Sequence, residues 1–262
     1  MVINFALITI DSLRYDVTQI ANSPNFEKLF AEHQRIGNGW EKVCAHGTYT
    51  LPAHVSMFTG GKFPSSFKAD PPFKHSHGLF RYGNNTRNAE FSLQETDTSV
   101  PGSFAAQGYR TIGVGGVDWF NSSFYSSRDL WSMYFKEFYY ADEFSPVIPN
   151  SFERQIQLLK TLDMKSLVFL FLNIASTHRP YRLKAEPDEK GNYPSYYIKS
   201  QVDAFEYVDS HILEVIDVIP RPANVFICSD HGECFTEVDG VSGHGFYHPS
   251  VMEVPACYLN LR

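Results

Sequence analysis

The apolar positions of this chain fall into short, nearly uninterrupted runs that are separated by polar stretches. Residues 3–10, 167–174 and 224–228 are three such runs, each of strand length. Runs of this kind are typical of strands buried on both faces, as in a parallel sheet that is covered by helices. In residues 201–219 the apolar positions recur near helical spacing, which predicts a long amphipathic helix. The pattern therefore predicts an α/β fold in which residues 3–10 form the first central strand.

Metal-binding residue types follow two of these predicted strands. Asp11 comes immediately after residues 3–10, and the pair Asp230 and His231 follows residues 224–228. Ligands of open α/β sheets bind at the carboxyl ends of the strands, and a carboxylate beside an imidazole there is half of a metal site. Two plainer interpretations stay open. Asp-His-Gly is an ordinary loop composition, and Asp11 could instead be the N-cap of the next helix.

Thr50 is predicted to lie at or next to the N-cap of a helix. Pro52 suits the first turn, where its missing N–H is not needed, and Gly60-Gly61 would end the helix. A hydroxyl at this position faces free N–H groups and the positive end of the helix dipole, which suits a phosphate-like group. An ordinary threonine N-cap followed by proline would explain the same residues.

Taken together, these segments resemble the alkaline phosphatase superfamily, and its sulfatase and phosphonate monoester hydrolase branch most closely. The resemblance consists of a strand ending in Asp-Ser-Leu-Arg, then Thr-x-Pro-Ala-His-x-x-x-x-Thr-Gly, then Ser-Asp-His-Gly-Glu, in the family's order. It extends over nearly the whole chain. It implies a three-layer α/β/α sandwich with a mostly parallel central sheet, as one catalytic domain over residues 1–262. It also implies that the usual C-terminal subdomain is lacking.

Two further loops resemble motifs of the same superfamily. The segment Thr177-His178-Arg179-Pro180-Tyr181 is similar to the family's His-x-Pro-Tyr loop, whose histidine faces the substrate or a second metal. The segment Ser242-Gly243-His244-Gly245 is similar to the His-Gly motif of phosphoethanolamine transferases. Residues 201–219 resemble the long helix before the Asp-His strand. Its polar face is expected to carry Asp203, Glu206, Asp209 and His211.

The resemblance implies a role for each matching residue. The expected ligands of one divalent metal are Asp11, Thr50, Asp230 and His231. Thr50 matches the nucleophile, and a bound cation would lower the pKa of its hydroxyl enough for attack on phosphorus. The product of that attack is a phospho-threonine enzyme, which water or an acceptor then resolves.

Other histidines match the positions that hold substrate oxygens, protonate the leaving group or bind a second metal. They are His54, His178 and His244, and His244 is also a candidate metal ligand. No carboxylate stands out for a second metal site, so whether the site holds one ion or two remains open. Asp, His and Thr ligands favour zinc or manganese. Loop or surface roles are favoured for His46, His75, His77 and His248.

Departures from the sulfatase pattern favour phosphoryl over sulfuryl chemistry. Sulfatases convert a cysteine or serine to formylglycine, and oxidation of Thr50 would give a ketone instead of that aldehyde. His54 stands where sulfatases carry an arginine, and residues 115–118 read Gly-Gly-Val-Asp where they carry Gly-Lys-Trp-His. The cations that contact sulfate are therefore missing.

Composition narrows the class of protein further. The chain has 262 residues, 43% hydrophobic and 19% charged, which is typical of a globular enzyme with a large core. The formal net charge of −7 disfavours binding to a nucleic-acid polymer. The four cysteines form no CxxC pair, and residues 3–10 are too short for a membrane anchor and lack a signal-peptide pattern. Free thiols and a cytoplasmic location are expected.

The sequence therefore predicts a metal-dependent hydrolase of phosphate monoesters or diesters, or of phosphonate esters. Its expected partner is a small-molecule phosphoester, and an oligomer or partner subunit that covers the site is a further expectation. A phospho-group transferase is one alternative. A binding or regulatory module without catalysis is the other, because basic substrate residues are missing. Substrate access is expected to be shaped by loops near residues 65–98, 121–150 and 182–195, which are rich in aromatic and polar residues.

Overall fold

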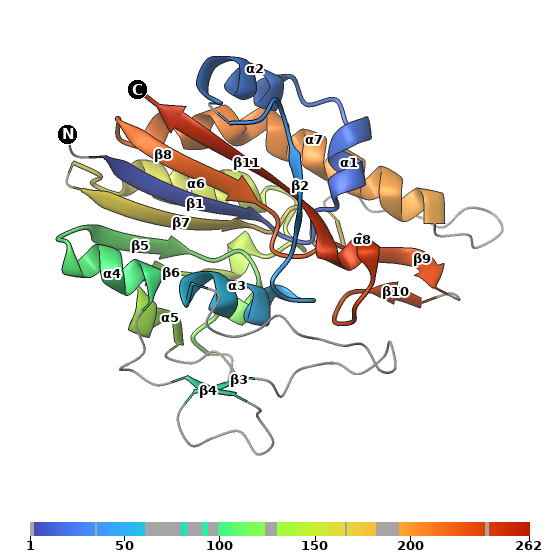
Figure 1. Ribbon diagram of the computed structural model, residues 1–262, viewed down its shortest axis with the longest axis horizontal. Helices are drawn as coiled ribbons and strands as arrows, with labels where there is room; N and C mark the ends of the chain where they lie inside the picture. The colour runs from blue at the N-terminus through green and yellow to red at the C-terminus, as the bar shows by residue number, and fades with distance from the viewer. Residues whose placement is uncertain are drawn as a thin grey trace.

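The centre of the protein is a seven-stranded sheet with the order β2-β11-β8-β1-β7-β5-β6 (Figure 1). The computed structural model describes residues 3–34, 36–60, 80–82, 91–93, 99–123, 130–165, 167–181, 194–238 and 241–262. The strands are β1 Asn4–Ile10, β2 Glu41–Cys44, β5 Arg110–Val114, β6 Glu137–Tyr139, β7 Val168–Ile174, β8 Ala223–Cys228 and β11 Glu253–Leu261. Only β11 runs antiparallel to its neighbours β8 and β2. The mostly parallel sheet and the central place of β1 are confirmed.

Helices cover both faces of this sheet and complete the three layers (Figure 1). One face packs against α1 Tyr15–Ile20, α2 Pro24–His33, α6 Ser151–Thr161 and α7 Pro194–Val218. The other face packs against α3 Thr50–Phe58, α4 Val100–Ala106 and α5 Leu130–Tyr134. The predicted α/β/α sandwich is therefore confirmed.

Short elements lie outside the main sheet. Two two-stranded ribbons are formed by β9 Cys234–Val238 with β10 Val241–Gly243, and by β3 Phe80–Tyr82 with β4 Phe91–Leu93. The helix α8 Pro249–Met252 and the 3-10 turns η1 Asp118–Phe120 and η2 Asp142–Phe144 complete the described elements. The β9–β10 ribbon follows Asp230 and His231 directly and so lies next to the candidate metal residues.

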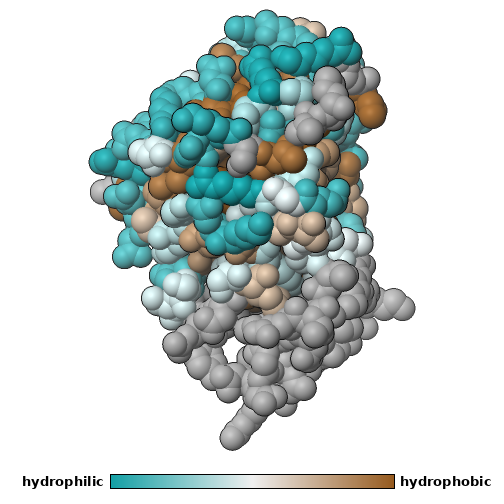
Figure 2. All heavy atoms as spheres, turned by 90° about the vertical axis from the view of Figure 1, so that its left-hand side faces the viewer, coloured by the Kyte–Doolittle hydropathy of each residue, from teal (hydrophilic) through white to brown (hydrophobic). Residues whose placement is uncertain are grey.

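The two edges of the sheet differ in chemistry because its interior strands β8, β1, β7 and β5 are parallel. Figure 2 looks onto the amino edge, where hydrophilic side chains surround scattered apolar ones. At the carboxyl edge the strands end in register, with Ile10 beside Ile174 and Thr9 beside Cys228. Asp11 and Asp230 therefore leave neighbouring strands at the same edge. Asp11 does not cap the next helix, since the N-cap of α1 is Arg14.

The long amphipathic helix is present, but it begins at Pro194, earlier than predicted. The expectation that Asp209 lies on the polar face of this helix is wrong, because Asp209 is only 2% exposed. The Asp209 carboxylate accepts the backbone N–H groups of Phe26 at 2.8 Å and Asn25 at 3.2 Å. It therefore satisfies free donors in the first turn of α2, where a carboxylate also opposes the positive end of the helix dipole.

All four cysteines are free; Cys44 is exposed, whereas the other three are buried. None of the helices in the described ranges is both long and apolar enough to cross a membrane.

Candidate active site

Asp11, Asp230 and His231 form a buried group at the carboxyl edge of the sheet. Their potential ligand atoms all lie within 4.8 Å of one another, and the three side chains are fully buried. His231 Nε2 lies 3.8 Å from Asp11 Oδ1 and 3.6 Å from Asp230 Oδ2. The geometry follows from the topology, because β1 and β8 are adjacent parallel strands whose ends carry these residues.

Asp230 presents one free oxygen to this group. Its Oδ1 accepts the N–H groups of Ser12 at 3.1 Å and His231 at 3.0 Å, whereas its buried Oδ2 has no hydrogen-bond partner within the described part of the chain. Burial and repulsion by Asp11 raise the pKa of Asp230 well above its ordinary value. A divalent cation would give Oδ2 a partner and offset the repulsion, so the donor set fits a metal.

His231 has the form that a metal ligand requires. Its Nδ1 lies 2.8 Å from the carbonyl oxygen of Gly232, to which the Nδ1–H donates, so Nε2 keeps its lone pair for the carboxylate side. Burial, together with the nearby His244, lowers the pKa of His231 well below its ordinary value. A neutral imidazole is the state that coordinates metals.

Thr50 lies beside the same group, at the first residue of α3. Its Oγ1 is 3.5 Å from Asp11 Oδ2 and 3.4 Å from His231 Nε2. Tyr49 is the N-cap, and Pro52 falls in the first turn, as predicted. The hydroxyl therefore lies at the positive end of a nine-residue helix, next to Asp11 and His231 of the candidate metal ligands.

Ser12 shapes the turn that brings the ligands together. Its φ of 61° lies in the left-handed region, which is uncommon for residues other than glycine. This turn directs the Ser12 N–H toward Asp230, while the Ser12 hydroxyl donates to Asp11 Oδ1 at 3.2 Å. Backbone strain of this kind is common at functional sites, where the surrounding structure holds it in place.

Asn173 on the neighbouring strand β7 and Thr177 in the loop after that strand support Asp11. Asn173 Nδ2 donates to Asp11 Oδ2 at 3.1 Å, and Thr177 Oγ1 donates to the Asp11 carbonyl oxygen at 2.6 Å. Burial alone would raise the pKa of Asp11, but nearby imidazoles and the Asn173 amide lower it. Asn173 was not among the predicted site residues. A signal for it existed, since it is the one strongly polar residue in a strand that is buried throughout.

His54 lies beneath this site and does not face a substrate. The ring is 0% exposed, with Nδ1 2.8 Å from the Thr50 carbonyl oxygen and Nε2 3.0 Å from Thr9 Oγ1. Burial lowers the pKa of His54 to about 4. Both ring nitrogens are engaged and the ring is neutral, so the expected roles in holding substrate or protonating a leaving group do not fit this geometry.

His178 and His244 lie on the open side of the group formed by Asp11, Asp230 and His231. The ring centroid of His244 is 4.4 Å from that of His231 and 5.3 Å from that of His178. His178 Nδ1 lies 2.7 Å from the Arg179 carbonyl oxygen, to which the Nδ1–H donates. Two loops distant in sequence are thus brought together as predicted. His244 is not part of the compact three-residue group, so its role as a metal ligand stays a prediction.

Glu233 holds His244 in place. Glu233 is fully buried, and its Oε2 lies 2.8 Å from His244 Nδ1, while Arg179 Nε lies 2.8 Å from Oε1. Burial would raise the pKa of Glu233, but His244 and Arg179 lower it. Burial would lower the pKa of His244, but the Glu233 carboxylate outweighs this effect and raises the pKa of the imidazole. The sequence offered Glu233 only as the last residue of Ser-Asp-His-Gly-Glu.

The remaining histidines have local partners or lie outside the described residues. His248 caps α8 by accepting the Ser250 N–H at Nδ1, at 3.2 Å. The exposed His46 lies 3.2 Å from the hydroxyl of Ser56. These contacts fit the loop and surface roles that were expected. His75 and His77 lie outside the described residues.

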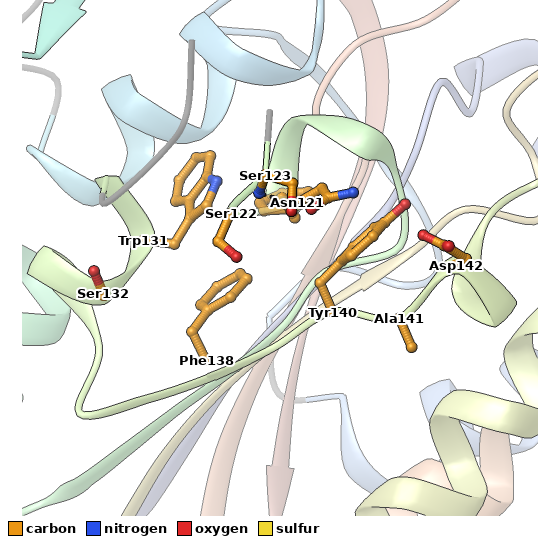
Figure 3. Close-up of a pocket in the computed structure, with 10 residues that line it drawn as sticks. Asn121, Ser122, Ser123, Trp131, Ser132, Phe138, Tyr140, Ala141 and Asp142 are labelled. Atoms are coloured by element: carbon orange, nitrogen blue, oxygen red, sulfur yellow. Dashed lines mark hydrogen bonds between the residues drawn. The ribbon is translucent and has the colours of Figure 1, made fainter. Parts of the chain in front are cut away.

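A hollow of about 540 Å³ is lined by residues of the segment 120–142 (Figure 3). One of them is Phe120, whose ring also contacts the His54 ring, with centroids 5.1 Å apart. The other lining residues are Asn121, Ser122, Ser123, Trp131, Ser132, Phe138, Tyr140, Ala141 and Asp142. These described residues include amide, hydroxyl and carboxylate groups but no cation, so the hollow suits a hydroxylated group better than a phosphate.

Comparison with known proteins places this geometry in a family. Residues 3–255 match the family model described as Sulfatase. A search of curated protein sequences finds no significant match. Among solved structures, the C-terminal periplasmic domain of EptC from Escherichia coli in complex with zinc is similar, with a TM-score of 0.64 and 12% identity, over 100% of this chain and 73% of that one.

Two further solved structures have the same fold. The soluble domain of lipooligosaccharide phosphoethanolamine transferase A from Neisseria meningitidis gives a TM-score of 0.63 at 15% identity, over 100% of this chain and 77% of that one. A protein in the alkaline phosphatase superfamily from Vibrio parahaemolyticus gives a TM-score of 0.59 at 14% identity, over 99% of this chain and 60% of that one. These identities establish the fold alone. Because the family model spans nearly the whole chain, the protein belongs to the sulfatase family.

Proposed function

We propose that the protein is a metal-dependent hydrolase of small phosphate esters that uses Thr50 as its nucleophile. The observation that carries this proposal is the position of Thr50 Oγ1, 3.5 Å from Asp11 Oδ2 and 3.4 Å from His231 Nε2. The hydroxyl therefore adjoins a buried donor set that includes an unpaired carboxylate oxygen, Asp230 Oδ2. Hydroxyl, carboxylate and imidazole donors fit zinc or manganese.

The metal would be held by Asp11, Asp230 and His231, with Thr50 as a fourth ligand. When bound, it supplies positive charge that lowers the pKa of the threonine hydroxyl and offsets charge on the phosphoryl oxygens. The chain itself orients the hydroxyl at the start of α3, next to the free N–H groups of the first turn. It also keeps His231 neutral through burial.

The reaction would proceed in two displacements at phosphorus. In the first, Thr50 Oγ1 attacks after losing its proton, an Oγ–P bond forms, and the ester P–O bond breaks. The leaving oxygen takes a proton as it departs. In the second, water attacks the phospho-threonine, the Oγ–P bond breaks, and phosphate is released with the hydroxyl restored.

His178 and His244 are the side chains that we assign to the substrate. Both use Nδ1 for a fixed partner, the Arg179 carbonyl and the Glu233 carboxylate respectively, so the remaining nitrogen of each is Nε2. Imidazoles in this arrangement can donate a hydrogen bond to a phosphoryl oxygen or a proton to the leaving oxygen. Whether they also hold a second ion stays a prediction.

The nucleophile assignment can be tested by activity and by trapping. Wild type, Thr50→Ser and Thr50→Ala would be compared on nitrophenyl phosphate with zinc or manganese, with the surface substitution Thr161→Ala as control. We expect Thr50→Ala to lose turnover and the acid-stable phospho-enzyme, and Thr50→Ser to keep both in reduced amount. Nitrophenyl sulfate should not be turned over by any of them. Full activity of Thr50→Ala would refute the assignment.

Phospho-group transfer to an alcohol is the second candidate. One of the similar solved structures is a lipooligosaccharide phosphoethanolamine transferase domain. Product analysis with added glycerol separates the two reactions: hydrolysis gives only phosphate, whereas transfer gives a glycerol phosphate.

A cytoplasmic location stays a prediction, and the matched EptC structure is a periplasmic domain.

A further inference from the structure

A chain of buried hydrogen bonds connects the sheet to the helix that carries Thr50. It begins at the Gly116 N–H, which donates to Asn173 Oδ1 at 3.2 Å. This contact fixes the orientation of the Asn173 amide, whose Nδ2 then donates to Thr9 Oγ1 and to Asp11 Oδ2, each at 3.1 Å. One nitrogen of Asn173 thus contacts both a candidate metal ligand and the threonine two residues before it on β1.

The Thr50 carbonyl oxygen fixes the direction of these hydrogen bonds. It can only accept, and His54 Nδ1 lies 2.8 Å from it, so the ring hydrogen lies on Nδ1. Nε2 of the neutral ring is then an acceptor, and it takes the hydroxyl hydrogen of Thr9, 3.0 Å away. The Thr9 oxygen accepts a hydrogen from Asn173, which leaves its own hydrogen for this bond. Every donor and acceptor in the chain is thereby matched.

Aromatic rings surround His54, and its Nδ1 also lies 3.7 Å from Asp230 Oδ2, which is too far for a hydrogen bond. The centroid of the His54 ring lies 6.0 Å from the ring of Phe58, 5.1 Å from that of Phe120 and 5.3 Å from that of Phe171. The ring is 0% exposed. A polar side chain in such an apolar environment is costly unless both of its polar atoms are paired. The two hydrogen bonds therefore meet the full requirement of the ring.

From this geometry we infer that His54, held as its Nδ1–H tautomer by the Thr50 carbonyl oxygen and by Thr9, is a positioning residue that ties the nucleophile end of α3 to strand β1. The same strand leads directly into Asp11. One imidazole thus sets the distance between the nucleophile and a metal ligand, without contacting substrate. This role rests on the proposed function, since it takes Thr50 to be the nucleophile.

The tautomer can be measured without any activity. Long-range proton–nitrogen NMR of protein labelled with nitrogen-15 histidine, at pH 7.5, should show His54 protonated on Nδ1 only. Adding inorganic phosphate should leave that state unchanged, and Thr9→Val should shift the Nε2 resonance and leave Nδ1 bonded. A proton on Nε2, or a change of tautomer when phosphate is added, would overturn the inference even if the enzyme is inactive.

Kinetics on nitrophenyl phosphate test the positioning itself. Misplacing a reacting group lowers the rate at saturation, so Thr9→Val and His54→Gln should lower kcat about tenfold or more and leave KM within about twofold. His54→Asn, which keeps a donor near the Nδ1 position, should retain more activity than His54→Gln. The matched control is Thr111→Val, which removes another buried strand hydroxyl, one that accepts the Lys136 N–H at 2.9 Å.

Two kinetic results would contradict the inference. One is an equal loss of kcat in Thr9→Val and Thr111→Val, which would mean that the chain only stabilises the fold. The other is a rise in KM for the His54 variants, which would mean contact with substrate. Failure of the proposed function is separate from both. It would show as full activity of Thr50→Ala, and the NMR result would still decide the state of His54.

Discussion

Replacing Asp230 by asparagine should stabilise the metal-free protein and destabilise the metal-loaded one. Asparagine keeps an oxygen for the Ser12 and His231 N–H groups, which now bind Asp230 Oδ1 at 3.1 and 3.0 Å. In place of the unpaired Oδ2 it offers an NH₂ group that can donate to Asp11. The substitution thus removes a buried like-charge contact and at the same time removes a candidate metal ligand.

The sign of the effect follows from the raised pKa of Asp230. Burial and Asp11 raise this pKa above its ordinary value of 3.8, so the contribution of this group to stability is fully present below pH 3.8 and is lost as pH rises through the folded pKa. The magnitude follows from the usual cost of a buried polar group without a partner, about 1–3 kcal/mol. We expect Asp230→Asn to recover about that much in the metal-free protein at pH 7, or roughly 2–6 °C in Tm.

Thermal unfolding with and without metal gives the test. With EDTA, Asp230→Asn should melt above wild type, by a margin that widens as pH rises above about 4. With zinc or manganese at about a hundred times Kd, wild type should gain about 2.7 kcal/mol and the variant much less. The control is Asp217→Asn, which removes a carboxylate that is 77% exposed and should change neither melt. If Asp230→Asn melts below wild type under both conditions, the electrostatic reasoning is refuted.

Three further outcomes are expected. Glu233→Gln should lower kcat on nitrophenyl phosphate about tenfold to a hundredfold by releasing His244, while zinc still raises Tm; unchanged kcat would contradict this. Asp209→Ala should lower the free energy of unfolding in urea by about 1–3 kcal/mol, because two N–H groups at the start of α2 lose their partner, and an effect as small as that of Asp217→Ala would contradict it. A thiol reagent should modify one cysteine of the native protein rapidly, and none in Cys44→Ser, because the other three thiols are buried; rapid reaction of a second thiol would contradict the burial.

The fold and the metal group could be predicted because their signals are local in sequence. An apolar run of strand length needs no knowledge of its neighbours, and parallel strands bring their carboxyl ends to one edge wherever they lie in the sheet. Asp11 and Asp230 therefore meet as a consequence of topology. Thr50 joins them because Pro52 fixes where α3 begins.

The partners of these residues could not be predicted in the same way. His54 is buried because α3 packs its inner face against Phe120 and Phe171, and nothing in the spacing of the motif distinguishes an inward from an outward histidine. Glu233 pairs with Arg179 and His244 only because two irregular loops approach each other. Loop conformations depend on tertiary contacts, which periodicity does not encode.

The electrostatics of the metal group adds an argument that the motifs alone cannot give. A site kept only for packing would not place two carboxylates beside each other in a fully buried position, with one oxygen unpaired. Such an arrangement is unfavourable for the empty protein, since burial and the Asp11 carboxylate oppose ionisation of Asp230. It becomes favourable when a cation neutralises both. The same feature that weakens the fold would thus favour binding of a divalent ion next to Thr50, and for this reason we explain the group by the proposed chemistry and not by stability.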